Sequence, residues 1–163
     1  MSAVFEPAVL HWGADIIRWA QARDLDPNLV ATVMQIESCG LLEARSNAGA
    51  QGLFQVMPFH FGDGEDPLDP ETNARRGLDY LQEAFQLAEG DLTKTLAGYN
   101  GGHSRIFGDP QGWPEETQRY VYWGTGIMRD ISQGSEESSR LQEWLEAGGY
   151  SLCNRAHTAL SLP

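Results

Sequence analysis

The sequence has few basic residues and no long apolar run. Of its 163 residues, 11 are Lys or Arg and 23 are Asp or Glu, which gives a formal net charge of -12. Phosphate backbones and anionic lipids repel so acidic a chain. No apolar stretch approaches the roughly 18 residues that span a bilayer, and no basic segment followed by an apolar one marks a signal peptide. We therefore expect no nucleic-acid partner and no membrane insertion.

Metal-binding patterns are absent as well. The acidic loop at 62–66 lacks the alternating Asp or Asn positions of an EF-hand. Ligand spacing is also missing among the four histidines, which are His11, His60, His103 and His157. We expect neither a metal nor another cofactor. The two cysteines, Cys39 and Cys153, permit one disulfide without demanding it, because buried free thiols are common.

Strand signals are nearly absent, whereas helix signals recur along the chain. Asp26-Pro27 and Asp69-Pro70 each resemble an N-cap followed by proline at the first helical position. Asp91 and Pro114 open two more helices. Together with apolar residues at helical spacing, these signals predict helices over 8–23, 27–37, 70–88, 92–99 and 114–131. We expect a compact all-α domain over residues 1–131, with residues 132–163 as a C-terminal helical extension packed on it.

Glu37 is the first candidate for chemistry. It continues the apolar stripe of Val30, Val33 and Met34 at the C-terminal end of its predicted helix. Burial disfavours the charged carboxylate there, and the negative end of the helix dipole adds to the effect. Both raise the pKa, as a general acid near neutral pH requires. The position of Glu37 alone does not exclude a structural role, in which the side chain turns to solvent or pairs with an Arg.

The sequence around and beyond Glu37 favours the catalytic interpretation. Glu37-Ser38 is followed by Ser-Asn-Ala-Gly-Ala-Gln-Gly-Leu-Phe-Gln-Val-Met-Pro at 46–58, then by Asn73, Gly77 and Tyr80-Leu81. The series ends with Ala-Gly-Tyr-Asn-Gly-Gly at 97–102, followed by Glu116-Thr117 and Tyr120-Val121. Five such pieces in order resemble the soluble lytic transglycosylase domain, a relative of goose-type lysozyme. The resemblance covers about residues 26–121 and implies a lysozyme-like fold.

The resemblance implies a role for each matched residue on the Glu37 side of the groove. Glu37 would protonate the glycosidic oxygen between N-acetylmuramic acid and N-acetylglucosamine. The Ser46 hydroxyl would lie near that carboxyl and the substrate, although serine also caps loops often. Gln55 and Met57 would line the groove. Without the motif, Met57 would be interpreted as a core residue.

Further matched residues would complete the groove from the opposite side. Tyr99 and Asn100 match the Tyr-Asn element that lies across the cleft from the acid, where the phenol can donate to the Glu37 carboxyl or to the developing charge. The alternative for Tyr99 is a half-buried core tyrosine. Glu116 matches a second family acid, which we interpret as structural or substrate-orienting. Tyr120 belongs to the last matched piece and is counted with the supporting residues.

The family mechanism needs one carboxylate, whereas ordinary glycosidases use two. After protonating the leaving group, the same Glu would deprotonate the muramic acid 6-hydroxyl, which closes a 1,6-anhydro ring without water. Goose-type lysozymes instead hydrolyse the bond. If this chain did the same, Asp63, Glu65 or Asp66 could position the water, although a charged loop is more often a solvated face. The motifs also leave open a chitinase-like enzyme and a catalytically silent glycan-binding module.

The implied substrate sets the expected partner and location. The partner is a peptidoglycan glycan strand, with chitooligosaccharide as the alternative, and we expect a monomer. Peptidoglycan lies outside the cytoplasm, so the chain is expected to be secreted, periplasmic or associated with the cell wall. Disulfides persist in these places. A Cys39–Cys153 bond would join the tail to the end of the Glu37 helix, and we favour that bond over two buried thiols.

Overall fold

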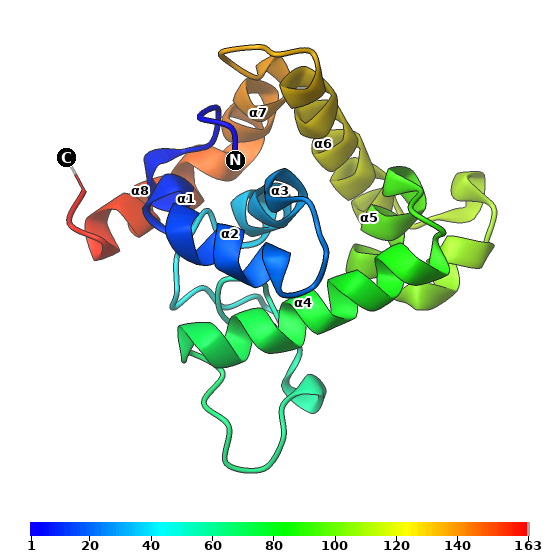
Figure 1. Cartoon of the computed structure of the whole chain (residues 1–163), viewed down its shortest axis with the longest axis horizontal. Helices are drawn as coiled ribbons and strands as arrows, with labels where there is room; N and C mark the ends of the chain where they lie inside the picture. Colours follow the sequence, from blue (N-terminus) through cyan, green and yellow to red (C-terminus); the bar gives the residue numbers. More distant parts are fainter. Residues whose placement is uncertain (163) are drawn as a thin grey trace.

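The computed structural model describes residues 1–162, which form helices joined by loops (Figure 1). The α-helices are α1 (Pro7–His11), α2 (Gly13–Gln21), α3 (Pro27–Glu37), α4 (Pro70–Leu87), α5 (Leu92–Gly101), α6 (Glu115–Ser132), α7 (Ser139–Trp144) and α8 (Tyr150–Ala159). Short 3-10 turns lie at Pro58–His60, His103–Phe107 and Pro110–Gly112. Residues 1–162 contain no β-strand, although isolated bridges join Gln51 to Arg45 and Val56. The predicted all-α class is confirmed.

The predicted capping aspartates begin three of these helices. The Asp26 side chain accepts a hydrogen bond from the backbone N–H of Asn28, Asp69 from that of Thr72, and Asp91 from that of Lys94. Each satisfies one of the backbone donors that a helix start leaves free. Proline follows the first two caps at a position where its missing N–H costs nothing. The starts of α3, α4 and α5 therefore follow from local sequence.

The prediction of one helix over 8–23 is wrong, because the chain breaks at Trp12. Helix α1 ends at His11 and α2 begins at Gly13, with Trp12 outside helical geometry between them. The Trp12 indole Nε1–H donates to the Gly40 carbonyl at 3.0 Å. The helix thus breaks at a residue whose side chain binds a partner 28 residues away in the sequence, and the apolar periodicity does not indicate this break.

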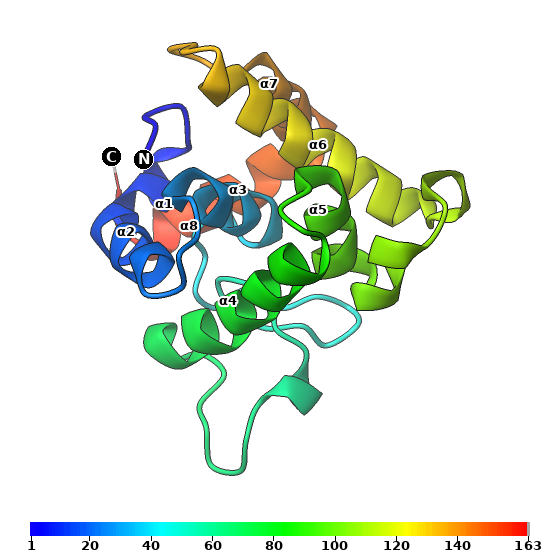
Figure 2. The same cartoon turned by 45° about the vertical axis from the view of Figure 1, so that its right-hand side comes forward.

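Helix α3 is the centre of the molecule. In Figures 1 and 2 it lies among α2, α4 and α6, and it packs directly on α2 and α6. All its residues from Leu29 to Gln35 are buried. The apolar side chains of α3 belong to the main core cluster. In this cluster they are joined by Phe54 of the 46–58 loop and by side chains of three other helices: Ile16 and Trp19 of α2, Leu78 and Leu81 of α4, and Ile127 of α6. This packing fixes the end of α3, which carries Glu37.

The C-terminal tail turns back along the molecule after α6. Asp130 accepts hydrogen bonds from the Ser138 hydroxyl at 2.7 Å and from the Arg140 backbone N–H at 3.1 Å, so the end of α6 organises the start of α7. A π-helical turn, Leu145–Gly149, follows, and Gly148 interrupts it with a φ of 131°. Helix α8 then packs on α1. None of the helices in residues 1–162 has the length and apolar character needed to cross a membrane.

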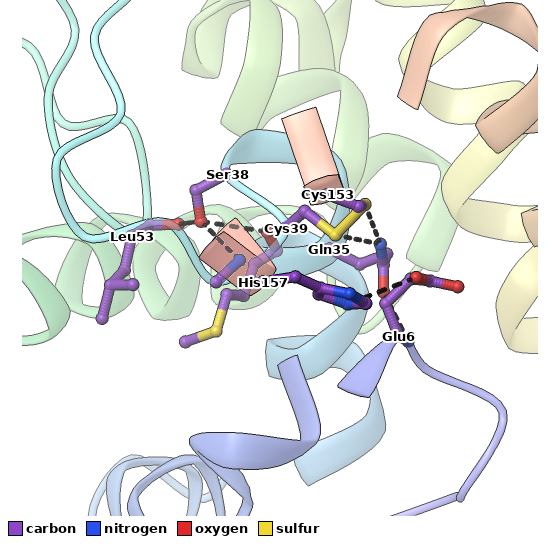
Figure 3. Close-up of a disulfide and its surroundings, with 9 residues drawn as sticks. Glu6, Gln35, Ser38, Cys39, Leu53, Cys153 and His157 are labelled. Carbon is purple, nitrogen blue, oxygen red and sulfur yellow. Dashed lines mark hydrogen bonds and ion pairs between the residues drawn. A yellow bond between two sulfur atoms is a disulfide. The ribbon is translucent and has the colours of Figure 1, made fainter. Parts of the chain in front are cut away.

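The disulfide between Cys39 and Cys153 is present and joins α8 to the chain just after α3 (Figure 3). Both cysteines are buried, at 0% and 1% exposure. The Gln35 amide Nε2 lies 3.1 Å from the Cys39 sulfur and 3.6 Å from the Cys153 sulfur. Its Oε1 accepts from the Glu6 backbone N–H at 3.1 Å. One buried amide thus links the disulfide to the N-terminal segment.

Candidate active site

A cleft of about 340 Å³ opens beside the C-terminal end of α3. It is lined by Glu37 and by residues from the 46–60 loop, α4, α5 and the start of α6. Seven of the eight residues predicted to catalyse or bind line this cleft; they are Glu37, Ser46, Gln55, Met57, Tyr99, Asn100 and Glu116. The eighth, Tyr120, lies behind the wall next to Glu37. The structure therefore brings the predicted residues together.

The loop that forms one wall of the cleft is held in place by two buried polar side chains. The Ser38 hydroxyl donates to the Leu53 carbonyl at 2.8 Å and accepts from the Gly40 N–H at 3.1 Å (Figure 3). The Asn73 amide accepts from the Phe54 N–H and donates to the Gln51 and Pro67 carbonyls, each at 2.9 Å. Most of these bonds satisfy loop backbone groups that lie outside helices and strands, and the Gln51 carbonyl accepts from the Val56 N–H as well.

Glycine is required where this loop passes α4. Gly52 has a φ of 79°, and a Cβ placed there would lie 2.2 Å from the Asn73 amide nitrogen. Any larger residue would displace Asn73 and the three hydrogen bonds it makes. The glycine of the motif thus serves the close approach of loop and helix, a role that glycine fills without steric cost.

Glu37 is the last residue of α3, and its partly buried side chain faces the cleft. Burial raises the pKa of the carboxyl to about 8; a contact with Tyr120 lowers it in part, and the negative charge of Glu116 raises it further. The sequence predicted this direction. At neutral pH most of the Glu37 population carries its proton, as a general acid must.

Tyr120, which is buried, and Tyr99, which is partly buried, both lie close to Glu37. The Tyr99 hydroxyl donates to the Phe54 carbonyl at 2.7 Å and not to Glu37, as in the alternative of a half-buried tyrosine with a satisfied hydroxyl. The Tyr120 hydroxyl makes no hydrogen bond of standard geometry within residues 1–162, yet it lies close enough to the Glu37 carboxyl to lower its pKa. Burial, followed by the Glu37 charge, raises the pKa of both phenols well above the usual value.

The loop residues Ser46 and Gln55 combine structural bonds with a place in the cleft wall. The Ser46 hydroxyl accepts from the Ala50 N–H at 3.0 Å, so it caps its own loop while exposed to the cleft. Gln55 has a φ of 47°, and its Nε2 donates to the Ala44 and Gly52 carbonyls at 3.1 and 3.0 Å. Met57 is half-buried and presents its side chain to the cleft.

Asn100 and Glu116 form the side of the cleft made by α5 and α6. The Asn100 carbonyl oxygen accepts from the Thr117 hydroxyl at 2.9 Å, which joins the two helices. Glu116 is exposed, and its carboxylate accepts no hydrogen bond from residues 1–162. Its charge acts on Glu37 through space.

The acidic loop at 62–66 lies outside the cleft wall. Neither Asp63, Glu65 nor Asp66 is among the residues that line the cleft. Glu65 instead binds the guanidinium of Arg76 through two bonds of 2.9 Å and that of Arg75 at 2.7 Å. Arg76, then Arg75, lowers the pKa of Glu65 to about 2. This carboxylate anchors the loop to α4.

Nine of the sixteen lining residues were not predicted as site residues. Four of these nine have large side chains, which are Phe59, His60, Arg76 and Tyr80. Tyr80 stood in a matched motif without an assigned role, and His60 was considered only as a metal ligand. Phe59 and Arg76 carry no local signal. Among residues 1–162, no three His, Cys, Asp or Glu side chains gather closely enough to hold a metal.

Comparison with known proteins identifies the family. The model of the transglycosylase SLT domain matches residues 15–111, which is more than half of the chain, so the chain belongs to this family. A transglycosylase of Enterobacteria phage PRD1 is 33% identical over 113 residues, which cover 68% of this chain and 40% of the phage protein. A soluble lytic murein transglycosylase of Salmonella typhimurium is 30% identical over 101 residues, covering 55% of this chain and 16% of that protein.

Solved structures share the fold. The inactive mutant of lytic transglycosylase Slt from Pseudomonas aeruginosa has a TM-score of 0.62 at 22% identity, covering 78% of this chain and 25% of that one. The 70-kDa soluble lytic transglycosylase in complex with bulgecin A has a TM-score of 0.61 at 22% identity, covering 76% and 25%. The matched region thus covers less than half the length of each protein named.

Proposed function

We propose that the chain cleaves the β-1,4 bond between N-acetylmuramic acid and N-acetylglucosamine in peptidoglycan, with Glu37 as the acid and base. The observation that carries this proposal is the Glu37 carboxyl, which lines a cleft of about 340 Å³ and has a pKa raised to about 8. A protonated Glu37 can give its proton to the glycosidic oxygen and then, as carboxylate, accept one from a nucleophile. Family membership supports the choice of substrate.

The nucleophile that fits this cleft is the 6-hydroxyl of the muramic acid. A two-carboxylate glycosidase places its second carboxyl opposite the acid to attack the sugar or activate water. Glu116 lines the cleft as an exposed side chain and we assign it no part in bond cleavage, and the acidic residues at 63, 65 and 66 lie off the cleft wall. Closure of the 6-oxygen onto C1 uses no second carboxylate and yields a 1,6-anhydro end. Hydrolysis to a reducing end is the alternative outcome.

The proposed substrate places the chain outside the cytoplasm, where the Cys39–Cys153 disulfide is stable. We propose that residues 1–131 carry the catalytic unit and that the tail from residue 132 braces it through α8. The unit would act as a monomer on a single glycan strand. Incubation with purified sacculi tests the activity: loss of turbidity and release of soluble fragments are expected, and intact sacculi would refute it.

The pH dependence of cleavage follows from the protonation of Glu37. Because the acid form is required and its pKa is raised to about 8, we expect kcat/KM to fall roughly tenfold per pH unit above about 8. Below that value Glu37 stays protonated and imposes no loss of its own. Initial rates on soluble glycan strands between about pH 5 and 10 measure this. A rate that falls with an apparent pKa near 4.5 would contradict the assignment.

A further inference from the structure

Four aromatic side chains form a continuous row along the cleft. The Tyr99 ring lies beside Glu37, and the row continues through Tyr80 and His60 to Phe59. Successive ring centroids are separated by 5.9 Å, 4.9 Å and 4.6 Å. All four side chains line the cleft, although they come from α5, α4 and the 3-10 turn at 58–60.

The inner part of this aromatic row is fixed by contacts behind it. Tyr80 stacks on His103 with centroids 4.0 Å apart and planes 14° from parallel. The His103 Nε2–H donates to the Tyr80 carbonyl at 3.2 Å, which holds the two residues together. Tyr99 is anchored through its bond to the Phe54 carbonyl. A ligand that meets these rings therefore finds them already in place.

The outer end of the row is exposed to solvent. Phe59 is 75% exposed and follows Pro58 in a turn of three residues. Single exposed aromatic residues are common, and Phe107 is 73% exposed elsewhere on the surface. Phe59 differs because it lines the cleft and adjoins His60, whereas Phe107 is not part of the cleft wall.

The chemistry of this row suits a chain of neutral sugars. In a β-1,4-linked glycan the ring substituents are equatorial, so each sugar presents faces of C–H bonds that pack on the electron-rich faces of aromatic rings. Burial, then the nearby His103 and Arg76, lowers the pKa of His60. The imidazole is therefore uncharged at neutral pH and can contact an apolar sugar face.

We propose that Phe59 and His60 extend the Tyr99–Tyr80 rings into a stacking platform that binds a sugar of the glycan strand away from the scissile bond. This inference rests on the proposed function and assigns its outer binding site. The platform contributes affinity, because its outer rings lie apart from the acid. Phe59, as the exposed end, makes the contact that a short ligand would not reach.

The test measures binding separately from cleavage. In the Glu37→Gln protein, which binds without turnover, we expect Phe59→Ala to weaken the Kd for soluble, peptide-free glycan strands roughly 5- to 20-fold. Phe59→Tyr should restore most of the affinity. The matched control is Phe107→Ala, which removes an equally exposed ring outside the cleft and should leave the Kd unchanged. In the active enzyme, Phe59→Ala should raise KM by a similar factor with kcat nearly unchanged.

Each outcome has a separate meaning. An unchanged Kd in Phe59→Ala, an equal loss in Phe107→Ala, or no binding of strands by the Glu37→Gln protein itself would overturn the platform. A parent chain that binds strands through Phe59 but releases no fragments would instead refute the proposed activity and leave the platform standing. A fall in kcat with unchanged KM would show that Phe59 positions the catalytic groups, and would also overturn it.

Discussion

The Glu37→Gln variant is expected to fold normally and to lose essentially all cleavage of peptidoglycan. The amide has nearly the same shape but cannot donate a proton to the glycosidic oxygen or later accept one. A positioned general acid or base contributes roughly 10²–10⁴-fold. Because Glu37 is proposed to serve in both steps, we expect a loss at the upper end of this range or beyond it. The rate of fragment release from sacculi provides the measurement.

Carboxylate-to-amide changes elsewhere are the matched controls. Glu116→Gln and Asp63→Asn should each retain most of the activity, since neither group is proposed to take part in bond cleavage. Glu116→Gln should also lower the pKa seen in the kcat/KM profile, because the Glu116 charge raises that of Glu37. Equal inactivation by Glu116→Gln would indicate a two-carboxylate mechanism. Near-parent activity of Glu37→Gln would refute the central assignment.

A stability measurement on the same variant provides an independent check. The pKa of Glu37 is raised on folding from an ordinary 4.5 to about 8, so the folded state binds this proton more tightly than the unfolded state. Its stabilising effect is complete below about pH 4.5 and is lost as the pH rises towards 8. The parent should therefore become progressively less stable than Glu37→Gln across that interval. Urea unfolding at about pH 4, 6 and 8 measures the difference.

Removal of the Cys39–Cys153 disulfide should cause the largest loss of stability. The bond closes a loop with a sequence separation of 114 residues, which restricts the unfolded chain strongly. For loops of this length the expected contribution is about 4–5 kcal/mol. The Cys39→Ala, Cys153→Ala double variant should lose free energy of unfolding on this order, with a fall in Tm of roughly 10 °C or more. Urea and thermal unfolding measure both.

The effect should also reach the active site. Cys39 lies two residues after Glu37, and the bond joins this part of the chain to α8. In the double variant, cleavage should decline at temperatures at which the parent remains fully active. Two controls separate the causes: the reduced parent should behave like the double variant, and Phe107→Ala should resemble the oxidised parent. A double variant with unchanged unfolding free energy would contradict this account of the tail.

The helices that the sequence predicted correctly are those with local signals. Asp26, Asp69 and Asp91 cap their helices through bonds that span two or three residues, so a short window contains the information. The break at Trp12 was missed because its side chain binds Gly40, which belongs to another part of the chain. The 3-10 turns were likewise not predicted, since runs this short give little periodicity.

The site residues that were predicted are those that belong to the sequence motifs. The apolar helix stripe made Glu37 a candidate, but the motifs around it were needed to favour the catalytic interpretation. The raised pKa follows from burial of the carboxyl. The partner of each tyrosine depends on how α5 and α6 approach α3, which no local pattern encodes. The Phe54 carbonyl, which accepts from the Tyr99 hydroxyl, was therefore not predicted. Phe59 and Arg76 reach the cleft through tertiary packing alone.

The most direct test of the proposed chemistry is mass spectrometry of the muropeptides that the chain releases from purified sacculi. Transfer to the 6-hydroxyl conserves mass relative to the intact strand, whereas hydrolysis adds one water for each bond that is cleaved. We predict products that end in 1,6-anhydromuramic acid, resist borohydride reduction and are absent from a Glu37→Gln digest. Reducible muramic acid ends as the main product would contradict single-carboxylate transfer and make the chain a hydrolase.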